Sequence, residues 1–93
     1  MPLSFTWDPR KDATNRRKHG VSFSEARTTF ADPLSLTISN PAHSRTDSRW
    51  ILVGRSQRGR LLVVAHEEDG DQIRILSARP ATRRERHAYE EEA

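Results

Sequence analysis

The 93-residue sequence contains no cysteine and one methionine, and aromatic residues make up only 6% of it. The absence of cysteine excludes disulfide bonds and zinc sites built on thiolates, and it agrees with a reducing compartment. No apolar run reaches membrane-spanning length, and the start has no basic-then-apolar signal pattern. We therefore expect one soluble, cytoplasmic domain, residues 1–93, without a membrane partner.

Lysine is also scarce, because only Lys11 and Lys18 among the sixteen basic residues are lysines. An arginine excess can reflect GC-rich coding DNA, or it can serve bidentate phosphate recognition. The basic residues cluster at positions 16–18, 55–60 and 79–86, and the acids collect at 67–71 and 90–92. Local clusters matter more to a partner than the net charge of +3, so this distribution favours an anion site with RNA as the leading ligand.

The first half of the chain predicts a strand followed by two capped helices. Asp8 suits a helix N-cap with Pro9 in the first turn, and Gly20 suits the C-terminal cap. Ser22 and Glu25 have the spacing of a capping box. The elements expected here are a strand at 3–7, a helix at 9–19 and a helix at 23–30.

The second half predicts a strand meander and a last helix. Apolar runs and alternation indicate strands at 34–39, 50–54, 61–65 and 73–76, with an irregular loop at 40–48. A capping box from Thr82 to Glu85 opens the last helix. The predicted class is α+β: a small antiparallel sheet, two N-terminal helices and one C-terminal helix, in the order β-α-α-β-β-β-β-α.

The predicted hairpin also predicts which polar side chains meet. A two-residue Asp69-Gly70 turn places Arg60 opposite Arg79, on the same face as His66. Two arginines in that arrangement repel unless an anion lies between them. The alternative is that Arg79 turns away at the corner after the strand and pairs with a carboxylate such as Glu85.

The preceding turn leaves two registers open. A two-residue loop would place Arg49 opposite Glu68, and a three-residue loop would place it opposite Glu67. Both faces of the 61–65 and 73–76 strand pair are apolar in the middle, so we expect cover on both sides.

Individual polar and aromatic residues each have two interpretations. His66 is either a half-buried residue at a strand end or a proton-transfer group. His19 either suits the helix dipole or takes part in acid–base chemistry. Trp7 either packs in the core or stacks on a base. The sequence has no HExxH, GxGxxG, P-loop or GxSxG pattern, so we expect no metal and no cofactor.

Four segments carry a family resemblance: FTWDPRK, KHGVSF, FADP and SARPATRRERHAYE. With them the chain resembles the BrnT toxins of type II toxin–antitoxin systems. The resemblance implies a RelE-like fold and a metal-independent endoribonuclease that cleaves RNA and arrests growth. It also implies a BrnA-type ribbon-helix-helix antitoxin in a hetero-oligomer, for instance 2:2, that binds operator DNA only as the complex. Pro80 stands where the family pattern has lysine or a similar polar residue.

A ribonuclease without a metal needs fixed cations for the phosphate and groups that move protons. The candidate catalytic residues are His66, Glu68, Arg79, Arg83 and His19. The candidate RNA-binding residues are Arg60, Arg84, Arg86, Lys18 and Trp7. Two alternatives are a non-catalytic nucleic-acid-binding module that uses the same arginines, and a structural partner protein that docks an acidic chain.

Overall fold

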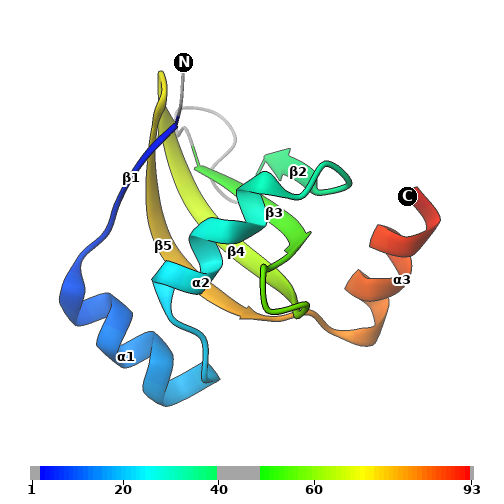
Figure 1. The fold of residues 1–93 in the computed structure, drawn as a ribbon, viewed down its shortest axis with the longest axis horizontal. Coiled ribbons are helices and arrows are strands. Elements are labelled where there is room, and N and C mark those ends of the chain that lie inside the picture. The colour runs from blue at the N-terminus through cyan, green and yellow to red at the C-terminus, as the bar shows by residue number, and fades with distance from the viewer. Residues whose placement is uncertain (1–2, 40–48, 93) are drawn as a thin grey trace.

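The computed structural model describes residues 3–39 and 49–92 of the chain. The loop predicted at 40–48, with His43 and Arg45, lies outside these residues. The elements, in chain order, are β1 (Ser4–Thr6), α1 (Pro9–His19), α2 (Phe23–Thr28), the short 3-10 helix η1 (Thr29–Ala31), β2 (Leu36–Ser39), β3 (Arg49–Arg55), β4 (Leu61–Asp69), β5 (Gln72–Pro80) and α3 (Arg83–Glu92). The predicted α+β class is confirmed (Figure 1).

The strands form a single five-stranded sheet in the order β1-β5-β4-β3-β2. Strands β2 to β5 are antiparallel neighbours, whereas β1 pairs in parallel with the start of β5. The prediction of a purely antiparallel sheet is therefore wrong at one edge. The meander leaves the outer edge of β5 without a strand neighbour, and β1 covers three residues of that edge, Gln72 to Arg74.

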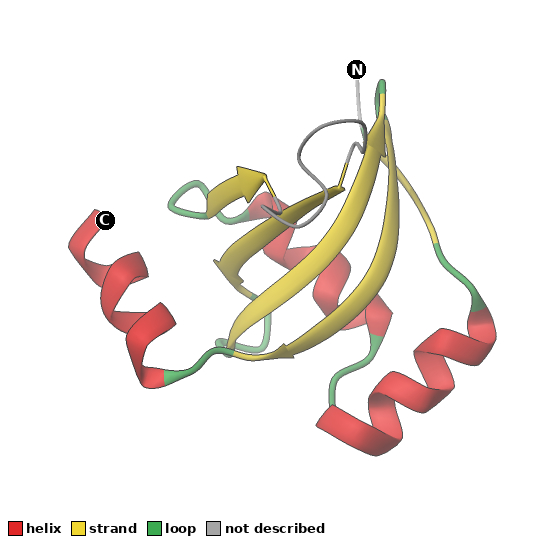
Figure 2. Ribbon diagram, turned by 180° about the vertical axis from the view of Figure 1, so that it is seen from behind, coloured by secondary structure: helices red, strands yellow, loops and turns green. Residues whose placement is uncertain are grey.

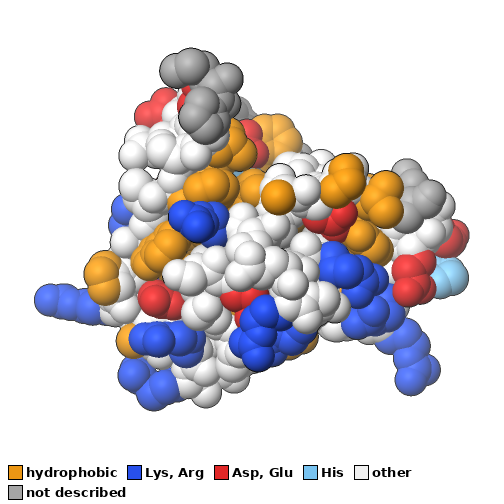
Figure 3. All heavy atoms as spheres, viewed as in Figure 1, with side chains coloured by type: hydrophobic (Ala, Val, Ile, Leu, Met, Phe, Trp, Pro, Cys, Tyr) orange, Lys and Arg blue, Asp and Glu red, His pale blue; other side chains and the backbone are white. Residues whose placement is uncertain are grey.

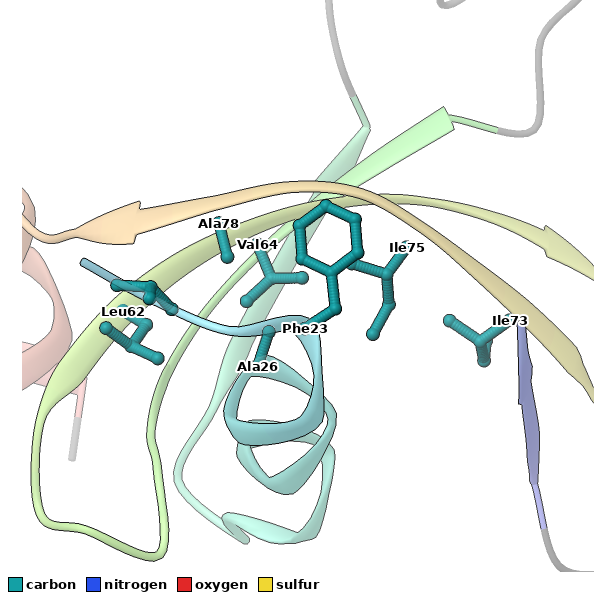
Figure 4. Packing of buried hydrophobic residues seen from close by; sticks show 8 residues of the cluster. Phe23, Ala26, Leu62, Val64, Ile73, Ile75 and Ala78 are labelled. Carbon is teal, nitrogen blue, oxygen red and sulfur yellow. The ribbon is translucent and has the colours of Figure 1, made fainter. Parts of the chain in front are cut away.

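Helix α2 covers one face of the sheet, in front of it in Figure 1 and behind it in Figure 2. Phe23 and Ala26 of α2 are fully buried and face the sheet. Figure 4 shows them directed at the apolar side chains of β4 and β5, namely Leu62, Val64, Ile73, Ile75 and Ala78. This packing of one amphipathic helix on the sheet forms the hydrophobic core.

The predicted caps of the first helix are confirmed. The Asp8 side chain accepts a hydrogen bond from Arg10 N at 2.9 Å, and Gly20 ends α1 in the left-handed conformation with a φ of 70°. The capping box predicted from Ser22 to Glu25 is only half formed. Ser22 Oγ accepts from Glu25 N at 3.1 Å, but the Glu25 carboxylate binds Ser56 and Arg60 instead.

The β4–β5 turn differs from the predicted one by one residue. Asp69 pairs with Gln72, so Gly70 and Asp71 are the two central residues. Gly70 has a φ of 60°, and no described non-glycine residue has a positive φ. A turn with glycine in the first central place needs only one positive φ, whereas an Asp69-Gly70 turn of the type I′ kind would need Asp69 to adopt one too.

A bulge in β5 shifts the register a second time. His66 pairs with Ile75, but Ala65 pairs with Ser77, which leaves Leu76 as an extra residue in β5. Beyond this bulge Arg79 pairs with Val63. Val63 lies on the face away from α2 because its neighbours along the strand, Leu62 and Val64, face the helix. The predictions that Arg60 lies opposite Arg79, and that His66 and Arg79 share a face, are therefore wrong.

Part of the face of the sheet away from α2 is buried. Leu61 and Val63 on that face are buried. The register that places Arg49 opposite Glu67 is confirmed. At the β2 edge Ile38 is 57% exposed, because an edge strand has a neighbour on one side only. The predicted half-buried strand is thus open on the side of Ile38.

Candidate nucleic-acid interface

Arg79 is held by a carboxylate at the corner between β5 and α3. Its two terminal nitrogens donate to the two Glu85 oxygens at 2.8 and 2.7 Å. Glu85 Oε1 also accepts from Thr82 N, and Glu85 N donates to Thr82 Oγ1, which completes the predicted capping box. The hydrogen bonds from Arg79 hold the pKa of Glu85 at about 2. The alternative interpretation, that Arg79 pairs with Glu85, is confirmed.

Three arginines at the start of α3 carry charges that no acid of the described residues neutralises. Arg83, Arg84 and Arg86 are exposed, and within residues 3–39 and 49–92 none of them has an ion-pair partner. They lie in the first two turns of the helix, where the N-terminal backbone N–H groups add partial positive charge. This end of α3 is therefore suited to bind a phosphate.

His66 lies in the core, so the prediction of a half-buried residue is wrong. Its side chain has no solvent exposure, and its ring packs edge-on against Phe30 at 4.8 Å. Its Nε2 lies 2.9 Å from Glu68 Oε2, and Glu68 is 38% exposed. Glu68 is therefore accessible from solvent, whereas His66 is not.

The His66–Glu68 pair is also remote from Arg79. His66 pairs with Ile75, which is four residues from Arg79 along β5. At roughly 3.3 Å per residue this separates the two places by about 13 Å along the strand. The two groups also lie on opposite faces, so the structure does not bring these predicted catalytic residues together.

His19 and Lys18 lie at the C-terminal end of α1. Both line a hollow of 320 Å³ between α1 and β5, together with Ser77 of β5. Ser77 is two residues from Arg79, which is roughly 7 Å along the strand. Among the predicted proton-transfer residues, His19 is therefore the one that shares a hollow with a β5 residue, Ser77, only two positions from Arg79.

Arg60 and Trp7 have partners inside the protein. Arg60 Nε donates to Glu25 Oε2 at 2.9 Å, and Arg60 also donates to the Gly20 carbonyl at 3.0 Å. Trp7 packs edge-on against Phe23, with ring centroids 6.2 Å apart. Both residues tie the helices to the sheet in this structure.

Glu25 is a buried acid whose role the sequence did not reveal. It accepts hydrogen bonds from Arg60 and from Ser56 Oγ, and Arg58 lies 3.6 Å away. The hydrogen bond from Arg60 lowers the Glu25 pKa most, ahead of the opposing effect of burial. This cluster fastens α2 to the β3–β4 turn.

Asn15 is a second residue whose role sequence reasoning missed. It is buried, and its amide nitrogen donates to the Val21 and Ala78 carbonyls at 2.8 and 2.7 Å. Its amide oxygen accepts from Ala78 N at 3.1 Å. The side chain thus continues the hydrogen bonding of the β5 edge where β1 has ended. An Asn on the same helix face as Lys18 and His19 was the only signal in the sequence.

The basic side chains gather along one rim of the molecule. In Figure 3 they lie over α1, below the β3–β4 turn and over α3. Figures 1 and 2 both place α1 and α3 on opposite sides of the lower sheet, with the end of β5 running between them. A nucleic acid strand along this rim would meet cations from both helices.

The described residues offer no metal centre and no membrane helix. Within them no three His, Asp or Glu side chains lie close enough to hold a metal ion. Similarly, none of the helices in residues 3–39 and 49–92 is long and apolar enough to cross a membrane.

Comparison of the sequence with protein-family models identifies the family of this chain. Residues 7–85 match the family described as "Ribonuclease toxin, BrnT, of type II toxin-antitoxin system". The chain belongs to the BrnT family. The match includes Arg79 and Arg83 and ends at Glu85, so Arg86 lies just beyond it.

A solved BrnT toxin has the same fold. The crystal structure of the Brucella abortus ribonuclease toxin BrnT aligns with a TM-score of 0.67 and 20% sequence identity. The alignment covers 87% of this chain and 99% of that toxin. No curated protein matches the sequence. The fold and the family are thus those of the BrnT toxins, and the antitoxin partner follows from the type II system.

Proposed function

We propose that this BrnT-family chain is a metal-independent endoribonuclease with a RelE-like fold that cleaves RNA and arrests growth. The observation that carries the proposal is the exposed arginine group at the start of α3. None of the three arginines, Arg83, Arg84 and Arg86, has an acid partner among the described residues. They come shortly after Arg79 in a chain that belongs to a ribonuclease toxin family.

The chemistry divides between these cations and a proton-transfer group. Cleavage needs the 2′-hydroxyl to lose a proton and attack the adjacent phosphate, while cations stabilise the charge that develops there. Arg83 and Arg86 are three residues apart on α3 and can bind one phosphate together. We propose Arg79 as a third cation, which shares its charge with Glu85 until RNA binds.

His19 and Glu68 are the acid–base candidates that solvent reaches. We assign His19 to the same phosphate region as Arg79, because Ser77 in its hollow lies two residues from Arg79. Glu68 lies at the hairpin end of β4, and the buried His66 can act only as a positioning residue for it. Lys18, Arg84, Arg60 and Trp7 remain proposed RNA contacts, and Arg60 and Trp7 would first have to leave their internal partners.

We also propose that a BrnA-type ribbon-helix-helix antitoxin neutralises the chain in a hetero-oligomer, with 2:2 as one arrangement. Operator DNA would be bound only by that complex. Support comes from the family description, which places these toxins in type II systems. The exposed cations of α3 offer an acidic antitoxin segment a place to compete with RNA.

The proposal is tested by expressing the full chain alone and together with the product of the adjacent gene. Expression alone should arrest growth, and co-expression should restore it. Purified protein should cleave RNA in the presence of EDTA. Arg83→Ala should lower the cleavage rate at least 10-fold, since one fixed cation at a developing charge contributes about 10²–10³ in rate.

Arg27→Ala is the matched control, because Arg27 is an exposed arginine on α2 that lies neither in the hollow nor on α3. Its cleavage rate should stay within twofold of the wild-type rate. RNA binding that depends strongly on salt, without any product, would overturn the ribonuclease proposal and support a non-catalytic binding module.

A further inference from the structure

The hollow between α1 and β5 is lined by cations and hydroxyl groups. Its volume is 320 Å³, and no Asp or Glu of the described chain lines it. The polar side chains that line it are Arg10, Lys11, Thr14, Asn15, Lys18, His19 and Ser77.

The sheet topology creates this hollow. Strand β1 covers the edge of β5 only as far as Arg74, and Asn15 covers it again at Ala78. Between these two points the edge is open at Leu76 and Ser77, and both residues line the hollow. Leu76 is the extra residue of the bulge, which is why two consecutive residues of β5 lie on one side.

The cations at the hollow are not neutralised by their own helix. Arg10, Lys11 and Lys18 have no ion pair among the residues that the structure describes. The two nearby acids are engaged elsewhere, because Asp8 caps α1 and Asp12 accepts from Phe23 N at 2.9 Å. The hollow is therefore lined by cations and by no carboxylate of the described chain, an arrangement that attracts an anion.

We propose that this hollow binds a phosphate group of single-stranded RNA, next to the phosphate that Arg79 and α3 bind. The hydroxyls of Thr14 and Ser77 can donate to phosphate oxygens, and the lysines and arginine supply the charge. Ser77 lies roughly 7 Å from Arg79 along β5, which suits two neighbouring positions on one strand of RNA. The inference rests on the proposed function only where it names RNA as the ligand.

The test is binding of a single-stranded 2′-O-methyl RNA, which cannot be cleaved, to the full chain. Lys18→Gln and Lys11→Gln should each weaken binding about fivefold or more, and each should reduce the slope of log K against log salt by about 0.7. Arg27→Gln is the matched control, since Arg27 is an exposed arginine on α2 that does not line the hollow. It should change the affinity less than twofold.

Equal effects of Lys18→Gln, Lys11→Gln and Arg27→Gln would overturn the proposal. Loss of antitoxin binding with unchanged RNA binding would also overturn it and assign the hollow to an acidic protein segment. Thr14→Glu is a further variant that places a carboxylate in the hollow, and it should weaken RNA binding as well. Thermal unfolding of each variant shows whether the fold is retained.

Cleavage of unmodified RNA by the wild-type chain is measured in parallel. If the wild-type chain cleaves RNA but the hollow variants bind RNA as tightly as the wild type, only the proposed phosphate site is wrong. If the hollow variants bind RNA more weakly but the wild-type chain does not cleave RNA, the ribonuclease function is wrong and the phosphate site is supported.

Discussion

Arg79 and Arg83 are four residues apart and carry the same charge, yet their surroundings give them different roles. Arg79 is bound by both Glu85 oxygens, whereas Arg83 is exposed without an acid partner in the described chain. A guanidinium that already holds a carboxylate must exchange or share it before it binds a phosphate. Exposure and the absence of a partner, not residue type, therefore single out Arg83 as the more available cation.

Asn15→Ala tests how much one buried amide holds α1 on the sheet. The change leaves Ala78 N and the Ala78 and Val21 carbonyls without a partner, so we expect the free energy of unfolding to fall by about 2–4 kcal/mol. Urea denaturation measures this. Thr14→Ala, at the adjacent exposed position, should change stability by about 0.5 kcal/mol or less. A similar small loss for Asn15→Ala would show that α1 does not depend on this side chain.

At the scale of elements, α3 is attached by few apolar contacts. Tyr89 is its one buried residue among those described, and Tyr89 OH donates to Asp32 at 2.7 Å. The Arg55 guanidinium lies 5.7 Å from the centre of the Tyr89 ring, and Glu85 binds Arg79. The attachment of α3 is therefore largely polar, and it should depend on pH.

Acid should weaken the Arg79–Glu85 contact. The folded-state pKa of Glu85 is lowered to about 2 from an ordinary value of 4.5. A lowered pKa stabilises the fold above the unfolded value and loses that contribution as the pH falls from 4.5 toward 2. We expect Glu85→Gln to lower the free energy of unfolding by about 1–2 kcal/mol at pH 6, after allowance for solvent screening at the 40% exposed Arg79.

The difference between wild type and Glu85→Gln in urea unfolding should shrink as the pH is lowered from 5 to 2.5. Other titrating groups affect both proteins equally and cancel in this difference. A gap that stays constant over this range would show that Glu85 carries no pH-dependent stability.

Elements were easier to predict from the sequence than their pairing. Asp8, Gly20 and the Thr82–Glu85 box mark helix ends through local hydrogen bonds, and these were found correctly. The bulge at Leu76 has no local signal, because it depends on how β5 fits between β4 and the helices. One extra residue reverses the face of Arg79, so the predicted meeting of Arg79 with His66 failed.

At the scale of the whole molecule, the fold separates paired from unpaired charges. Glu25 of α2 binds Arg60 beside the β3–β4 turn, and Glu85 of α3 binds Arg79 of β5. Among the described residues, Arg10, Lys11 and Lys18 of α1 and the arginines in the first turns of α3 have no ion pair, and basic side chains lie over both helices along one rim (Figure 3). A net charge of +3 therefore understates the field that a nucleic acid strand would meet.

The salt dependence of RNA binding measures how many of these charges act together. Replacing Arg83, Arg84 and Arg86 with Gln should lower the slope of log K against log salt by about 2, at about 0.7 per phosphate contact. Arg27→Gln, at an exposed position on α2, should leave the slope unchanged. An unaltered slope in the triple variant would show that RNA does not contact the start of α3.

The sequence by itself determined the α+β class, the helix ends and the family, because caps, periodicity and motifs are local properties. It also located the arginines of α3, whose exposure follows from their place in a polar helix. Only the tertiary structure decided that His66 is buried, that Arg79 is bound by Glu85, and that Lys18 and His19 share a hollow with Ser77. Those outcomes depend on a bulge and on contacts between segments far apart in the chain, which no local pattern specifies.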